Sequence, residues 1–181
     1  MNYFLLAILF ALSGFFMKIS DDFVDVNDDL KSATIFGVLC ALTSAAVAVG
    51  NAGAAYIIIA IPIGNFFAFK IDGIHHFVTM VLFAIICLIC GIPQLNFVVL
   101  LICILAALAD EVGHELVPEK TDNEFLNLFF EYRFVMKIVI FLLAVCGVFD
   151  IWAFVCFILF ELSYVGAEIV FNRFNLKRIQ G

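Results

Sequence analysis

Five aspartates stand within nine positions at the end of the first apolar stretch. They belong to the segment KISDDFVDVNDD, residues 18–29. Asp21, Asp25 and Asp29 are spaced four residues apart, so on a helix they would share one face. Like charges at this spacing repel, and the low dielectric at a membrane boundary strengthens the repulsion. A divalent cation would offset it, and Mg²⁺ prefers carboxylate oxygens, so the segment predicts metal-binding chemistry.

Two later groups of acids and histidines repeat this spacing. In both groups, side chains four residues apart would share a helix face. Imidazole nitrogens suit Zn²⁺, Mn²⁺ or Fe²⁺ better than Mg²⁺, so the predicted cofactor is Mg²⁺ or another divalent cation. The candidate metal ligands of all three groups are Asp21, Asp22, Asp25, Asp29, Asp72, His75, His76, Asp110, Glu111, His114 and Glu115.

Basic side chains border the same three groups. They could neutralise the acids, bind a phosphate, or merely mark the cytoplasmic side of a membrane. The candidate phosphate-binding residues are Lys18, Lys31, Lys70 and Arg133. A further acid, Glu161, lies near the middle of an apolar stretch, where it could relay a proton or cation or form a hydrogen bond between helices.

The composition indicates which elements position these groups. Of the 181 residues, 66 % are apolar, whereas soluble domains average roughly 45–50 %. Such an excess predicts an all-α, multi-pass bundle in the cell membrane, forming one domain over residues 1–181. The net charge of −7 and the lack of a basic footprint argue against nucleic-acid binding. The N-terminal stretch lacks a positive segment and a cleavage site, so we expect a retained first helix.

Seven apolar stretches approach the length of a membrane span, which is about 20 residues. The connections after the first, third and fifth stretches, with the C-terminal segment, hold all nine Lys and Arg residues. The positive-inside rule therefore predicts an external N-terminus and a cytoplasmic C-terminus. Residues 124–134 mix acids with aromatics and predict an interfacial helix that could cover the site. The predicted spans are Tyr3–Ile19, Ser32–Val49, Ala52–Phe69, Ile74–Cys90, Gln94–Ala109, Phe134–Val148 and Ile151–Phe171.

The first and third groups align with one another. DDFVDVNDDLK, residues 21–31, can be set over DEVGHELVPEK, residues 110–120, so that Lys31 meets Lys120. Four predicted helices separate the two segments, which corresponds to a parallel internal repeat over about residues 3–69 and 94–171.

The first segment reads D-D-x-x-D-x-x-x-D and resembles the N-D-x-x-D-x-x-x-D motif of the UbiA family of intramembrane prenyltransferases. The family's second motif, D-x-x-x-D, would correspond to residues 110–115. Asp21 replaces the family's leading Asn, and the chain has fewer predicted helices than the family's nine. The resemblance implies a transferase in which Mg²⁺ binds a prenyl diphosphate. It implies these catalytic residues: Asp22, Asp25, Asp29, Glu111 and Glu115.

Two other classes of function fit the same residues. In a divalent cation transporter or channel, the acidic groups would form the entry and Glu161 would lie on the path. In a non-catalytic membrane protein, the acids would form a metal-stabilised face. The external half of the predicted bundle has few polar residues, which favours chemistry or binding at the cytoplasmic face. The expected partners are membrane lipids, including a lipid diphosphate.

Overall fold

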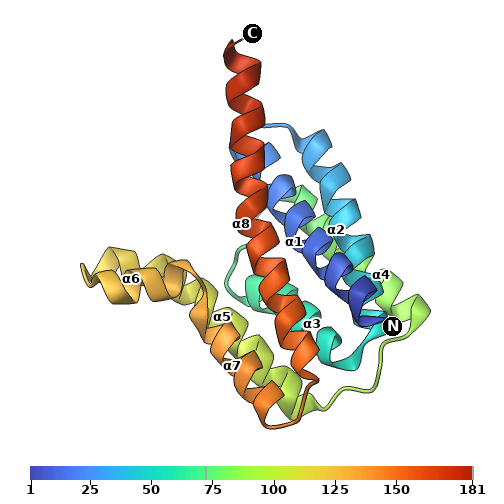
Figure 1. Ribbon diagram of the computed structural model, residues 1–181. Coiled ribbons are helices and arrows are strands. Elements are labelled where there is room, and N and C mark those ends of the chain that lie inside the picture. The colour runs from blue at the N-terminus through green and yellow to red at the C-terminus, as the bar shows by residue number, and fades with distance from the viewer. Residues whose placement is uncertain (72, 181) are drawn as a thin grey trace.

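The computed structural model describes residues 1–71 and 73–180, with side chains except at Glu119 and residues 176–180. The prediction of an all-α fold is confirmed, because every regular element in these residues is a helix (Figure 1). The helices are α1 (Tyr3–Asp25), α2 (Leu30–Gly50), α3 (Ala52–Phe67), α4 (Ile74–Cys90), α5 (Phe97–Lys120), α6 (Glu124–Glu131), α7 (Phe134–Val145) and α8 (Ile151–Gln180).

Each predicted apolar span corresponds to one helix, and the predicted interfacial segment corresponds to α6. Four helices, α1, α2, α5 and α8, contain apolar segments long enough to cross a membrane, as is typical of an integral membrane protein. The other three apolar helices, α3, α4 and α7, have 16, 17 and 12 residues. At about 1.5 Å per residue, α7 extends roughly 18 Å, less than the roughly 30 Å of a hydrocarbon core.

Two helices continue beyond the apolar stretches that predict them. The first was expected to end at Ile19 but continues to Asp25, and the fifth was expected to end at Ala109 but continues to Lys120. The apolar pattern therefore ended the first and fifth spans too early, since residues 20–25 and 110–120 are helical, as the four-residue spacing of their acids requires. Charged side chains end an apolar run without ending a helix, because they leave the backbone hydrogen bonds intact.

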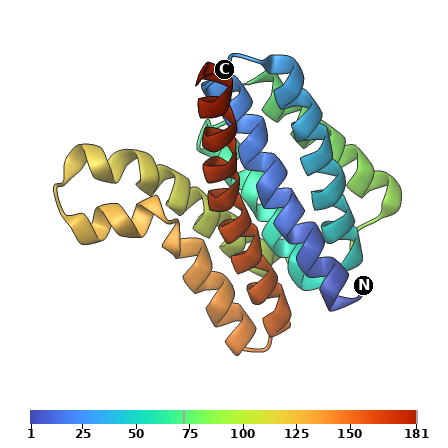
Figure 2. The ribbon, with the colours of Figure 1, turned by 45° about the horizontal axis from the view of Figure 1, so that its top comes forward.

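Helix α1 packs between α2 and α8, and its C-terminal end lies on the same side of the molecule as the C-terminus (Figures 1 and 2). Helix α4 packs against α2, while α3 packs against α5. The α1–α8 contact is close at Gly14, where an added Cβ would lie 2.3 Å from the carbonyl oxygen of Phe160. Small residues permit such approaches between membrane helices. The packing leaves α6 extending sideways from the bundle (Figure 2).

Candidate functional site

Acidic side chains from α1 and α5 line one cavity of about 340 Å³. Its remaining wall is partly apolar, with Ile58 of α3, Phe83 of α4 and Phe160 of α8 among its residues. The cavity thus joins a polar region to an apolar one. The predicted site residues that line it are Asp21, Asp25, Lys70, His76, Asp110, Glu111, His114 and Arg133.

The other predicted site residues lie outside the lining of this cavity. Asp29 caps the N-terminus of α2, accepting hydrogen bonds from the backbone amide and hydroxyl of Ser32. Lys31 is exposed in the first turn of α2. Asp72 lies outside the described residues. The remaining four, Lys18, Asp22, His75 and Glu115, make contacts that are described below.

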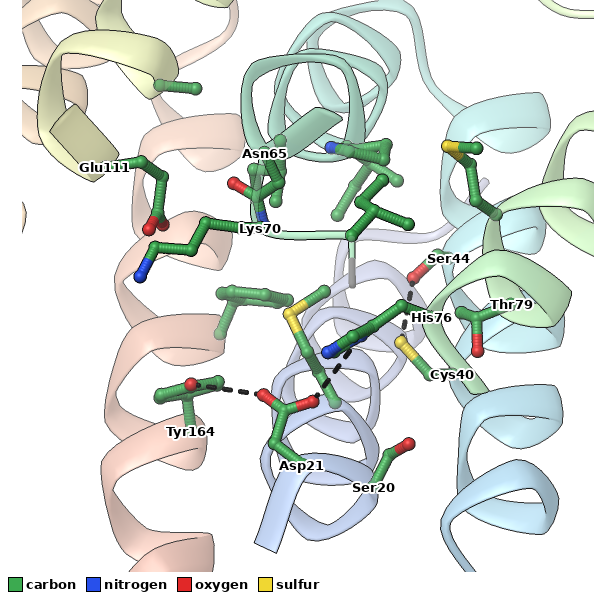
Figure 3. Close-up of a pocket in the computed structure, with 18 of the residues that line it drawn as sticks. Ser20, Asp21, Cys40, Ser44, Asn65, Lys70, His76, Thr79, Glu111 and Tyr164 are labelled. Atoms are coloured by element: carbon green, nitrogen blue, oxygen red, sulfur yellow. Dashed lines mark hydrogen bonds and ion pairs between the residues drawn. The ribbon is translucent and has the colours of Figure 1, made fainter. Parts of the chain in front are cut away.

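Asp21, His75 and His76 meet where α1 packs near the start of α4. One ligand atom from each lies within 4.8 Å of the other two. The Oδ1 atom of Asp21 is 3.8 Å from Nδ1 of His76, and Tyr164 donates a 3.4 Å hydrogen bond to Oδ2 (Figure 3). The two imidazole rings lie 3.9 Å apart between centroids, and His75 is only 3 % exposed. The structure thus joins predicted ligands of the first and second groups.

Asp110 stabilises the N-terminus of α7. Its two carboxylate oxygens accept hydrogen bonds from the backbone amides of Val135 at 2.9 Å and Met136 at 2.7 Å. The N-cap residue, Arg133, has a left-handed backbone with φ of 49° and forms no side-chain cap. Asp110 therefore satisfies amides that a local cap would otherwise bind, and its negative charge suits a helix N-terminus.

Arg133 forms an ion pair with Glu111 through two of its guanidinium nitrogens. Its Nε lies 2.9 Å from Oε1, and its Nη2 donates to Oε2 at 3.5 Å. The guanidinium also lies 5.9 Å from the centroid of the Tyr164 ring. Burial alone would lower the pKa of Arg133, but the charge of Glu111 outweighs it and the pKa is raised. Arg133 thus remains a cation and links α5 to the face of α8.

Three lysines are paired with acids in the same region. Lys18 lies 3.1 Å from Asp22 and 3.5 Å from Glu168, both measured between nitrogen and oxygen. Lys70 lies 2.5 Å from Glu115. Lys137 lies 2.9 Å from Glu161. The bases therefore neutralise acids of the same region, and Glu161 takes part in an ion pair between α7 and α8.

Asp25 differs from these neutralised acids. It lines the cavity at the last residue of α1 and is exposed. Among the side chains that the structure describes, which leave out Glu119 and residues 176–180, no hydrogen bond or ion pair engages that of Asp25. Its charge also acts on Asp21, one turn earlier. Asp21, on which the positive charge of Lys18 also acts, and Asp25 thus both face the cavity from α1.

Tyr164 is a site residue that sequence reasoning missed. Its hydroxyl contacts Asp21, and its ring lies near the charged ends of Lys18 and Arg133. Its spacing could have indicated this role. Tyr164 lies three residues after Glu161 and four before Glu168, so the three side chains share one face of the helix. A tyrosine on that face can approach the same acids and bases.

The sequence matches no family model and no curated protein, and the structure matches no solved structure. The resemblance to the UbiA family therefore rests on the two short acidic motifs and on helix order.

Proposed function

We propose that the protein is a multi-pass membrane enzyme that binds a divalent cation and acts on a lipid diphosphate in this cavity. One observation carries the proposal: acids from α1 and α5, distant in sequence, line a single cavity that also has an apolar wall. The acidic part suits a cation and its phosphate ligand, and the apolar part suits a hydrocarbon chain.

The donors available in the cavity fit Mg²⁺. Mg²⁺ is commonly held by one or two carboxylates, with water and substrate phosphate as the other ligands. Asp21 and Asp25 supply two such carboxylates. Glu111 is engaged by Arg133, and Asp110 by two backbone amides, so both contribute charge to the site with fewer free oxygens. We therefore assign the cation mainly to the α1 carboxylates.

The surrounding residues favour departure of a diphosphate. A divalent cation would neutralise the negative charge that develops on the leaving group. Lys70 and Arg133 add positive charge to the cavity wall, although each also pairs with a glutamate. The bond between the lipid carbon and the diphosphate oxygen breaks, and its electron pair leaves with the diphosphate. The nucleophilic atom of an acceptor then bonds to that carbon and releases a proton.

Binding of Mn²⁺, followed by electron paramagnetic resonance, tests this proposal. Farnesyl diphosphate should tighten Mn²⁺ binding to the purified protein, because its phosphate oxygens complete the coordination of the ion. Inorganic diphosphate should do so less, since it cannot occupy the apolar wall. Asp25→Asn should weaken the effect at least tenfold. Asp28→Asn is the matched control, because Asp28 lies outside the cavity lining and Asn tolerates its φ of 52°.

Two results would contradict the proposal. The first is Mn²⁺ binding that is equally strong with and without farnesyl diphosphate. The second is saturable Mn²⁺ uptake into proteoliposomes that carry the wild-type protein, which would favour a cation transporter.

A further inference from the structure

We propose that Asp21, His75 and His76 form a binding site for a divalent transition metal of the Zn²⁺ type. Among the residues that the structure describes, this is the only group of three or more His, Cys, Asp or Glu side chains near enough to share an ion. The site goes beyond the cation of the proposed enzyme and does not require a lipid diphosphate. It shares one carboxylate, Asp21, with that function.

The chemistry of the donors selects the metal. Two imidazole nitrogens and one carboxylate oxygen are typical ligands of Zn²⁺ and its first-row neighbours, whereas Mg²⁺ favours oxygen alone. Metal–ligand bonds of about 2.0–2.2 Å at the tetrahedral angle place neighbouring ligand atoms about 3.4 Å apart. The ligand atoms here lie within 4.8 Å of one another. Small side-chain rotations, of about 1 Å at the ligand atoms, would therefore bring all three onto one ion.

Two glycines leave the space that His75 and its neighbour Thr79 occupy. A Cβ at Gly73 would lie 2.4 Å from Cε1 of the His75 ring, so the ring occupies space that another residue would fill. A Cβ at Gly37 of α2 would lie 2.2 Å from Oγ1 of Thr79, whose hydroxyl donates to the backbone carbonyl of His75 at 2.8 Å. Close packing of α2 and α4 thus holds the start of α4 beside α1.

Tyr164 orients the carboxylate toward the histidines. Its hydroxyl bonds to Oδ2 of Asp21, while Oδ1 faces His76 (Figure 3). A hydrogen bond to the second oxygen of a ligating carboxylate is a common means of fixing its direction. Tyr164 therefore acts as a positioning residue for this site.

Charge and access also favour a cation. Asp22 and Asp25 add negative charge beside Asp21, while Lys18, whose positive charge also acts on Asp21, forms its ion pair with Asp22. Asp21 and His76 line the cavity, so an ion bound there would be reachable from it. Three protein ligands leave the fourth position of a tetrahedral metal open to water or to an oxygen of a bound molecule, as in catalytic zinc sites.

Titration with Co²⁺, a coloured substitute for Zn²⁺, tests the site in protein purified without a polyhistidine tag and without lipid diphosphate. We expect visible absorption bands typical of tetrahedral Co²⁺ at one ion per chain, and competition by Zn²⁺. His76→Gln and Asp21→Asn should weaken binding more than tenfold. Tyr164→Phe should weaken it 10–100-fold, as loss of an outer-shell partner does. Asp28→Asn is the matched control for Asp21→Asn.

Several outcomes would overturn the inference. One is a wild-type protein that binds no Co²⁺, which would leave Asp21 and His76 as an ion pair alone. Another is a spectrum that survives in His76→Gln but is lost in His114→Gln. Gly73→Ala provides a second variant that retains all three ligands, and it should weaken Co²⁺ binding by displacing the His75 ring. Failure of the farnesyl diphosphate experiment with an intact Co²⁺ spectrum would contradict the proposed enzyme and leave this site standing.

Discussion

Aspartates of one short motif have different surroundings. Asp25 faces the cavity, whereas Asp29 caps α2 through Ser32. The hydroxyl and the amide of Ser32 stabilise the Asp29 carboxylate and lower its pKa from the ordinary 3.8. Spacing alone could not separate these roles, because Asp25 ends α1 and Asp29 follows the break in the helix.

The cap at Asp29 predicts a pH dependence of stability. Because the pKa is lower in the folded protein, the ionised cap contributes stability above pH 3.8, and this contribution is lost as the pH falls through the folded value. Asp29→Asn should remove this part of the dependence, while its amide oxygen can still cap the helix. Thermal unfolding in detergent at several pH values below 6 would measure the difference. Identical pH profiles for the variant and the wild type would contradict it.

Two glutamates on α5 form ion pairs of different burial, so removing their charges should lower the free energy of unfolding by different amounts. Glu111 is buried against Arg133, so Glu111→Gln leaves a partly buried guanidinium without its counter-charge. We expect a loss of about 1–3 kcal/mol in the free energy of unfolding. The pair of Glu115 with Lys70 is more exposed, with Glu115 at 50 %, so Glu115→Gln should cost about 0–1 kcal/mol. Denaturation of both variants in the same detergent compares them, and equal losses would contradict the assignment.

At the scale of helices, the apolar pattern predicted which elements exist better than where they end. All seven apolar stretches became helices, and the amphipathic segment became α6. The ends of α1 and α5 were placed too early, since the pattern measures contact with lipid rather than backbone hydrogen bonding. Proline did not mark an end either, because Pro62 and Pro118 both lie inside helices.

Close packing of α1 on α8 makes Gly14 sensitive to substitution. In Gly14→Ala the new methyl would lie 2.3 Å from a backbone carbonyl, which cannot rotate away as a side chain can. The two helices must separate, and overpacking of this kind costs about 1–3 kcal/mol. Gly166→Ala on α8 is the matched control, because no atom lies within 4 Å of its added Cβ. Thermal unfolding should give a lower midpoint for Gly14→Ala alone; similar midpoints would contradict this packing.

Across the whole molecule, the sequence indicated which charged residues lie near the cavity but not which of them form hydrogen bonds or ion pairs with one another. The acids of α1 and α5 were expected to lie at one end of the bundle, and four of them, Asp21, Asp25, Asp110 and Glu111, line one cavity. The sequence could not show that Asp110 caps α7 or that Arg133 forms an ion pair with Glu111, because both contacts depend on how α5 and α7 pack. The sequence did not single out Tyr164, because a tyrosine in an apolar helix commonly serves only in packing or in a hydrogen bond between helices.

The path of the chain predicts that α7 crosses the membrane despite its 12 residues. Helices α5 and α8 run in the same direction, so α7 must return the chain to the other side (Figure 1). Asp122→Cys and Val148→Cys flank α7 at exposed positions. They would be introduced with Cys90→Ser and Cys146→Ser, since those two thiols are exposed and the other four cysteines are buried.

Labelling of intact cells with a membrane-impermeant maleimide measures the sidedness of these positions. The thiol at 148 should react, and the thiol at 122 should react only after permeabilisation. Local thinning of the bilayer can accommodate a short span at a modest energetic cost, so the length of α7 does not forbid the crossing. Reaction of both thiols from the same side would show that α7 does not cross, and the orientation of α8 relative to α5 would then conflict with a membrane-embedded bundle.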